Sequence, residues 1–148
     1  MSEEKIVGIL KEFREAYVSK NIEKMLSFLT EDVVWVTAMG TFRGKNDVKR
    51  YFDWDAKVTP GLSLRDIGSG LVVKGNRGFA EVATEWMISD HEKVGMPVMF
   101  AFDLNNDKIQ QVRVYYDRLS IAKQVAKGGM EKMAVDGIVN AMEKGLNT

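Results

Sequence analysis

The sequence predicts an α+β domain in which N-terminal helices pack on one face of a mainly antiparallel sheet. Before Leu62, apolar residues recur mostly at helical spacing, and from Leu62 onward the period changes to two. Turn-forming segments then divide the second region into several strands. With 148 residues, 45% of them hydrophobic, the chain is long enough for one compact core.

Two helices are expected before the first strand. Ile6, Leu10 and Phe13 share one face of the first helix, and Ser2 ahead of two glutamates is a typical start signal. The segment NIEKMLSFLTED repeats the helical pattern, and Asn21 can cap it by accepting a backbone hydrogen bond. Charged residues surround the apolar face of each helix, as is typical of helices that bury one side.

The first strand is predicted from Asp32 to Ala38. Val33, Trp35 and Thr37 fall on one side of this extended segment, and the opposite side is apolar as well. A strand with two apolar faces must be covered on both. After a turn, the segment GKNDVKRYFDWDAK predicts a third helix.

Four further strands follow, separated by turn-forming residues. The segment NNDK is a strong hairpin signal, and SDHEKVG is expected to form a longer loop. The predicted strands are Leu62–Val73, Phe79–Ser89, Pro97–Leu104 and Ile109–Asp117.

The tail from Ser120 to Thr148 predicts helices with a break at Gly128 and Gly129. The apolar stripe that follows this break must cover another surface. We therefore expect one domain over residues 1–118 and a C-terminal helical extension over residues 119–148. The extension would pack on the same domain or on a partner subunit.

Composition excludes several classes of function. Lys and Arg together number 21, as do Asp and Glu, so no overall field favours nucleic acid or an anionic membrane. The absence of cysteine and the single histidine exclude disulfides, thiolate metal sites and chemistry that needs paired imidazoles. The N-terminal segment is charged throughout, and no apolar run approaches the roughly 18 residues of a membrane span. We expect a soluble cytoplasmic protein without metal or cofactor.

Three segments, FLTEDVVW, TFRGKNDVKRYF and DKIQQVRVYYD, combine with the order of elements into a recognisable pattern. This pattern resembles the SnoaL-like branch of the NTF2-like superfamily, which includes ketosteroid isomerases, limonene-epoxide hydrolases and polyketide cyclases. The resemblance covers about residues 5–118. It implies a cystatin-like cone, in which a curved sheet wraps around a helix-lined cavity, and a homodimer formed through the outer sheet face.

The residues of the isomerase reaction do not carry over to this chain. The resemblance places Thr37 at the position of the carboxylate base, Phe13 at that of the tyrosine and Met99 at that of the protonated aspartic acid. A threonine hydroxyl is not a base near neutral pH, and the other two side chains have no acidic proton. The known isomerase route is therefore not expected.

The residues of the epoxide hydrolases do not carry over either. Their three charged positions fall on Thr84, Trp86 and Val114, and their tyrosine and asparagine positions fall on Trp35 and Thr37. None of these side chains is a carboxylate that could activate water or protonate an epoxide.

Strand alternation and both alignments instead agree on an apolar, aromatic-lined interior. Its few polar atoms are hydroxyls and indole N–H groups, which suits a small hydrophobic or aromatic molecule held by burial and one or two hydrogen bonds. The predicted wall consists of Phe13, Tyr17, Trp35, Thr37, Phe52, Thr84, Trp86, Met99, Val112, Val114 and Tyr116.

Two alternatives stay open at this point. An enzyme of isomerase, epoxide-hydrolase or polyketide-cyclase type could use Tyr17, Asp103 or Tyr116 as catalytic residues. Alternatively, the cone is filled and the outer sheet face serves as a dimerisation or interaction surface. The acidic segment Asp53–Asp55 is predicted to be an exposed loop at a helix end, with Trp54 packed back.

Overall fold

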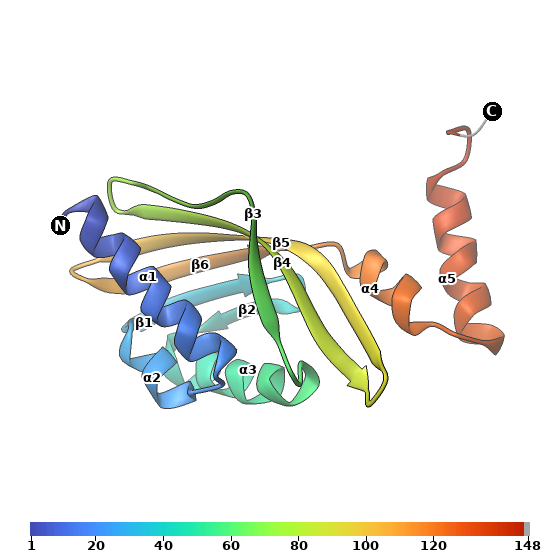
Figure 1. The fold of residues 1–148 in the computed structure, drawn as a ribbon, viewed down its shortest axis with the longest axis horizontal. Helices are drawn as coiled ribbons and strands as arrows, with labels where there is room; N and C mark the ends of the chain where they lie inside the picture. Colours follow the sequence, from blue (N-terminus) through green and yellow to red (C-terminus); the bar gives the residue numbers. More distant parts are fainter. Residues whose placement is uncertain (147–148) are drawn as a thin grey trace. The chain divides into compact units, whose positions relative to one another are not determined.

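The computed structural model describes residues 1–146 and divides the chain into two compact units, Met1–Tyr116 and Asp117–Thr148. Figure 1 shows the helices and strands of the described residues. The helices are α1 (Glu3–Val18), α2 (Ile22–Ser27), α3 (Gly44–Val58), α4 (Arg118–Val125) and α5 (Gly129–Met142). The strands are β1 (Leu29–Thr37), β2 (Gly40–Arg43), β3 (Ser63–Lys74), β4 (Arg77–Ser89), β5 (Glu92–Asn105) and β6 (Lys108–Tyr115).

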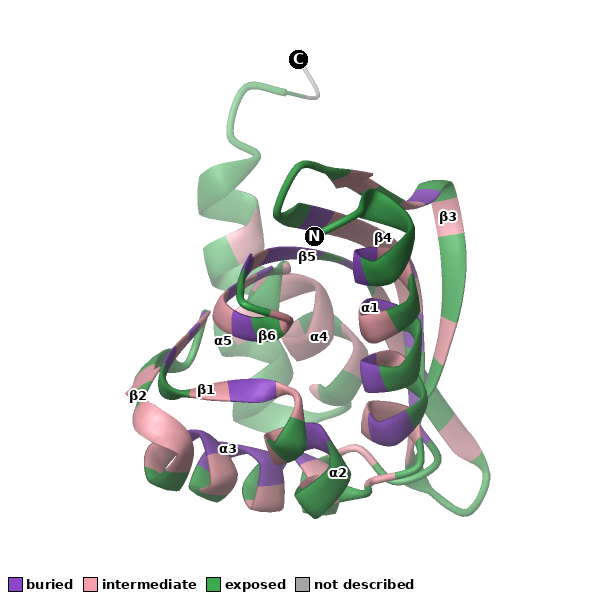
Figure 2. Cartoon of the chain, turned by 90° about the vertical axis from the view of Figure 1, so that its left-hand side faces the viewer, coloured by how far each residue is buried: buried purple, intermediate pink, exposed green. Residues whose placement is uncertain are grey.

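The strands of the first unit form a 6-stranded sheet in the order β2-β1-β6-β5-β4-β3. Neighbouring strands are antiparallel, except that β1 and β6 pair in parallel with Trp35 opposite Val112. The sheet is curved, and α1 lies within its curve while α3 closes the side below β1 (Figures 1 and 2). The predicted α+β class, with helices on a curved and mostly antiparallel sheet, is confirmed.

The first two helices begin where their capping residues predict. The Ser2 hydroxyl accepts a hydrogen bond from the backbone N–H of Lys5 at 3.2 Å. The Asn21 side chain accepts one from the backbone N–H of Lys24 at 3.0 Å. Each cap satisfies a backbone donor that has no partner inside its helix, so the start of the helix is set locally.

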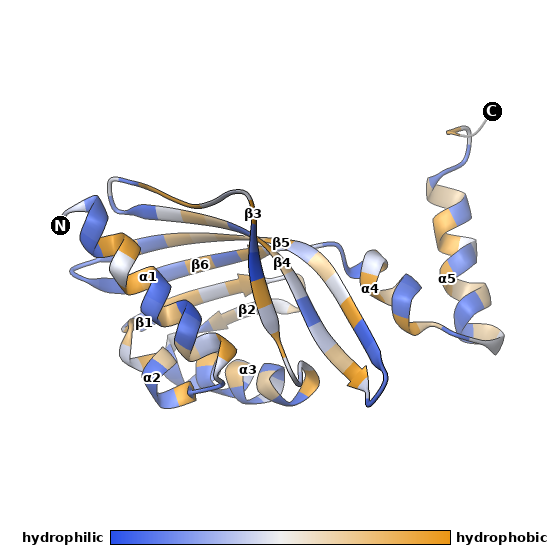
Figure 3. Ribbon diagram, in the orientation of Figure 1, coloured by the Kyte–Doolittle hydropathy of each residue, from blue (hydrophilic) through white to orange (hydrophobic). Residues whose placement is uncertain are grey.

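The core lies between α1, α3 and the inner face of the sheet. Ile6 and Leu10 of α1 are buried, and so are Trp35 and Thr37 on one side of β1. Figure 2 shows buried segments in purple along α1, α3 and β1, and Figure 3 shows hydrophobic residues alternating with hydrophilic ones along the strands. The apolar periodicity of the sequence therefore identifies the inward faces of α1 and β1.

Two connections differ from the prediction. The segment after Met39 forms β2, which pairs with β1 and places Phe42 opposite Trp35. The expected long loop between β4 and β5 is instead a short turn at Asp90 and His91. In both places the strands continue to pair up to the turn, because a hairpin ladder satisfies backbone groups that a loose loop would leave to water.

The second unit contains α4 and α5. Residues 126–128 separate them, so the predicted break is present, although Gly129 already belongs to α5. Whether this extension covers its own domain or a partner subunit stays a prediction. Within the described part of the chain, no helix is both long and apolar enough to cross a membrane.

Candidate functional site

Aromatic rings fill much of the interior between α1, α3 and the sheet. The ring centroid of Phe13 lies 6.0 Å from that of Trp35 and 6.2 Å from that of Phe102. Trp35 and Phe52 meet edge to face, with their centroids 4.9 Å apart. Such pairs are favourable beyond the area that they bury, so this part of the cone is a packed core.

The structure places most of the predicted wall in the interior. Tyr17 and Tyr116 are half-buried and pack against the aromatic core. The buried members are Phe13, Trp35, Thr37, Phe52, Thr84, Trp86, Val112 and Val114.

Met99 is the exception, and its placement corrects the alignment. Its side chain is 36% exposed, and it pairs across the sheet with Glu81 and with the exposed Tyr115. Phe100, the next residue, is buried. Because successive side chains on a strand point to opposite faces, an alignment shifted by one residue exchanges the inner and outer positions.

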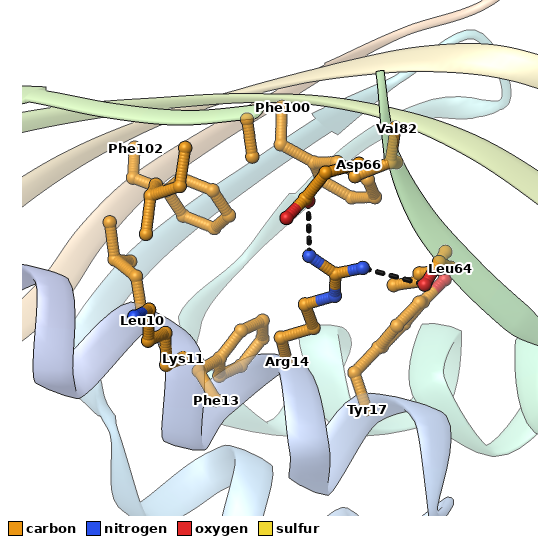
Figure 4. A pocket seen from close by; sticks show the side chains of 12 residues that line it. Leu10, Lys11, Phe13, Arg14, Tyr17, Leu64, Asp66, Val82, Phe100 and Phe102 are labelled. Carbon is orange, nitrogen blue, oxygen red and sulfur yellow. Dashed lines mark hydrogen bonds and ion pairs between the residues drawn. The ribbon is translucent and has the colours of Figure 1, made fainter. Parts of the chain in front are cut away.

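A cavity of about 70 Å³ lies between α1 and the strands β3, β4 and β5. Figure 4 shows it from close by, with the helix on one side and the strands on the other. Phe13 and Tyr17 belong to both the predicted wall and this lining. The lining residues are Leu10, Lys11, Phe13, Arg14, Tyr17, Leu64, Asp66, Leu71, Ala80, Val82, Phe100 and Phe102.

Polar groups of this lining meet at the side where α1 faces β3. The Arg14 guanidinium donates a hydrogen bond to the Leu64 carbonyl oxygen at 2.6 Å and forms an ion pair with the Asp66 carboxylate (Figure 4). These contacts join the helix to the strand. The deeper lining, which includes Phe100 and Phe102, is apolar.

A carboxyl group lies in the interior, contrary to the prediction for Asp53–Asp55. These residues belong to α3 rather than to a loop, Asp55 is only 8% exposed, and Trp54 is exposed instead of packed back. The Tyr17 hydroxyl donates a hydrogen bond to Asp55 Oδ2 at 2.8 Å. The spacing of Asp55 from Phe52, three residues earlier on the helix, was the sequence signal for this burial.

The surroundings of Asp55 shift the acidity of several groups. Burial raises the pKa of the Asp55 carboxyl, while the Tyr17 hydrogen bond and the charge of Lys20 oppose that change. Burial also raises the pKa of Tyr17 well above its usual value, and the nearby Asp55 charge adds to the effect. Burial raises the pKa of Tyr51 as well. A carboxyl of weakened acidity beside a phenol is a chemically competent proton donor and acceptor.

Lys20 and Thr59 connect the ends of α1 and α3 beside this pair. The Lys20 ammonium donates a hydrogen bond to the Thr59 hydroxyl at 2.6 Å, and that hydroxyl donates to the Asp55 carbonyl oxygen at 2.8 Å. Burial lowers the pKa of Lys20. The described residues contain no cluster of His, Cys, Asp and Glu that could hold a metal ion.

Asp103, a catalytic candidate from the sequence, has a different environment. Its carboxylate oxygens accept hydrogen bonds from Arg77 at 2.6 Å and from Arg113 at 2.6 Å. The Asp103 carboxylate is therefore held in ion pairs with two arginines on the sheet. Tyr116, another of these candidates, is half-buried and packs against the aromatic core.

Comparisons with known proteins agree on the fold. The structure resembles that of a candidate SnoaL-like polyketide cyclase from Jannaschia sp. CCS1, with a TM-score of 0.75 and 11% identity over 86% of this chain and 95% of that one. TerC, co-crystallised with polyporic acid, gives a TM-score of 0.72 and 15% identity over 83% of this chain and 99% of that one.

A third similar structure is a hypothetical protein of ketosteroid isomerase-like fold from Catenulispora acidiphila DSM 44928, solved in complex with trimethylamine. It gives a TM-score of 0.69 and 15% identity over 78% of this chain and 90% of that one. A search of curated protein sequences found no match. The SnoaL-like domain family matches residues 10–112, which is more than half of the chain. The helices, the curved sheet and this match together show that the chain belongs to the SnoaL-like domain family.

Proposed function

We propose that this SnoaL-like protein binds a small, largely apolar molecule with a flat ring in the interior between α1 and the sheet. The cavity bounded by Phe13, Phe100 and Phe102 carries this proposal, because its deep side offers aromatic and aliphatic surface. Structures of similar fold that hold trimethylamine or polyporic acid give it support.

The present size of the cavity sets a condition on binding. Its volume of about 70 Å³ is well below the roughly 300 Å³ or more of typical ligand pockets. A ring must therefore displace side chains or move α1 away from β3. Burying about 200 Å² of apolar ligand surface would supply on the order of 5 kcal/mol before the cost of association, which is compatible with micromolar affinity.

Filling the cavity is expected to weaken binding about tenfold or more. Ala80 lines the cavity, so the change Ala80→Leu places a larger side chain in the space that the ligand would take. The measurement is titration calorimetry with a neutral bicyclic alcohol, 2-naphthalenemethanol, on wild type and variant.

The matched control is Ala83→Leu, which adds the same side chain to the same strand on the opposite face. This control should bind the alcohol with wild-type affinity. Equal affinities in the Ala80→Leu and Ala83→Leu proteins, or no binding to the wild type, would contradict the proposed site.

The buried Asp55–Tyr17 pair favours a second function, proton transfer beside a carbonyl group. Burial raises the pKa of Asp55, which makes its carboxylate a stronger base than an exposed one, and the Tyr17 hydrogen bond orients it. Asp55 would take a proton from the carbon next to the carbonyl and leave an enolate. Asp55 would then exchange that proton with solvent and return a solvent proton to the carbon.

This second function predicts hydrogen exchange into an aromatic ketone. In D₂O, the wild-type protein should accelerate deuterium incorporation into the methyl group of 2-acetonaphthone, followed by NMR. Asp55→Asn should lower the accelerated rate by about 10²-fold or more, since it removes the base. Asp103→Asn, which removes a carboxylate held by two arginines, should keep the rate; a loss as large as that of Asp55→Asn would refute the assignment.

A further inference from the structure

At the edge of the cavity where α1 meets β3, a cationic side chain lies beside an interruption in the pairing of β3. Arg14 extends from α1 and makes its contacts with β3 through Leu64 and Asp66 (Figure 4). Lys11, one turn earlier on α1, also lines the cavity. Two cationic side chains and one carboxylate thus stand where the apolar interior meets the surface.

Strand β3 is held weakly at this point. It is the edge strand of the sheet, with β4 as its neighbour. Its pairing with β4 shifts register between Asp66 and Leu71, and Gly68 between them has φ +56. The interruption removes hydrogen bonds between β3 and β4 beside the Arg14 contact. This part of β3 can therefore move while breaking fewer hydrogen bonds than a regular strand would.

The Arg14–Asp66 pair is also a replaceable contact. The Asp66 side chain is 56% exposed, and an exposed ion pair contributes little to stability because water serves each charge nearly as well. A guanidinium has its donors arranged in a planar fork that matches a carboxylate. A carboxylate on a ligand could therefore take the place of Asp66, while Asp66 turns into water.

We propose that the molecule bound in the interior carries a carboxylate or similar acidic group, that it enters between α1 and β3, and that Arg14 holds the acidic group in place of Asp66. The inference rests on the proposed binding function. It adds the chemical class of the ligand, an aromatic acid, and the direction from which it enters. The ring lies against Phe100 and Phe102, and the acid remains at the edge where Arg14 and Lys11 lie.

A pair of matched probes tests this inference. 2-Naphthoate and 2-naphthalenemethanol share the same ring and differ in charge. The wild-type protein should bind 2-naphthoate about tenfold more tightly than the alcohol. Arg14→Gln should bring the ratio of the two affinities close to one, whatever the change in the affinity for the alcohol, since only the carboxylate loses its partner.

A second variant tests the exchange of partners. Asp66→Asn removes the competing carboxylate, so the affinity for 2-naphthoate should rise several-fold relative to the affinity for the alcohol. Arg77→Gln is the matched control, because Arg77 forms an ion pair with Asp103 rather than with Asp66. It should keep the wild-type preference. If Arg14→Gln does not fold, the change in affinity for 2-naphthoate in Asp66→Asn still tests whether a ligand carboxylate replaces Asp66.

The outcomes separate the two proposals. If the alcohol binds but 2-naphthoate binds no more tightly, or if the preference persists in Arg14→Gln, the role of Arg14 is refuted and the binding function stands. If Asp66→Asn gives no gain, the exchange of partners is refuted. If neither probe binds to the wild type, the binding function fails and this inference fails with it.

Discussion

Replacing Trp35 by alanine is expected to lower the free energy of unfolding by about 3–5 kcal/mol. The side chain is 1% exposed and is among the largest that are fully buried. It contacts Phe52 edge to face at 4.9 Å and lies 6.2 Å from the ring of Tyr51. Its removal leaves a large void among rings that belong to different elements and cannot all move inward.

Urea unfolding followed by circular dichroism measures this effect. The matched control is Trp54→Ala, because this tryptophan is 42% exposed. Among the ring pairs of the described residues, Trp54 contacts only Tyr51. Trp54→Ala should lower the free energy of unfolding by about 1 kcal/mol or less. Similar costs for the two variants would mean that the rings around Trp35 are not the centre of the core. Trp35→Phe, a milder change, serves if the alanine variant does not fold.

Changing Asp55 to asparagine is expected to remove a pH-dependent loss of stability. Burial raises the pKa of Asp55 in the folded protein, so the folded state retains this proton at a pH where the unfolded chain has lost it. The stabilisation is fully present below the unfolded pKa of about 4 and disappears as pH rises through the raised folded pKa. Between these two pKa values, titration of Asp55 lowers the free energy of unfolding of the wild type by up to about 1.4 kcal/mol for each pH unit.

Asparagine imitates the neutral carboxylic acid and can still accept the Tyr17 hydrogen bond. The difference in unfolding free energy, Asp55→Asn minus wild type, should therefore rise between pH 4 and neutral pH. Urea titrations at successive pH values measure this difference, which cancels the contribution of the other carboxyl groups. Asp53→Asn, on the same helix and paired with Lys49, controls for removal of a carboxylate from α3. A difference that is constant or falls over this range would show that Asp55 is not buried as a weakened acid.

The sequence predicts those parts of the fold that depend on neighbouring residues. Ser2 and Asn21 mark helix starts because a cap acts within a single turn. The strands from Leu62 onward follow from alternation, and the hairpin at NNDK follows from its turn residues, whereas the turn between β4 and β5 is shorter than expected. The strand β2 was missed because its residues become a strand only through pairing with β1, which local propensity does not encode.

The candidate site depends on contacts that the sequence does not reveal. Asp55 lies on the same helix face as Phe52, so the periodicity was present, but an aspartate on that face is tolerated only because Tyr17 comes from another helix. Met99 shows that a shift of one residue in an alignment exchanges the two faces of a strand. The cavity could not be located either, because its volume is what remains after side chains from four elements have packed.

The parallel pairing of β1 with β6 has a consequence for how the protein is made. Trp35 lies opposite Val112 in that pair, although about two-thirds of the first unit separates them in the sequence. During synthesis, the apolar β1 leaves the ribosome long before its parallel neighbour β6 exists, and closing so long a loop is slow. The nascent chain can pair β1 with β2 early, but the other edge of this apolar strand has no partner until β6 is made, which leaves that edge open to aggregation during synthesis.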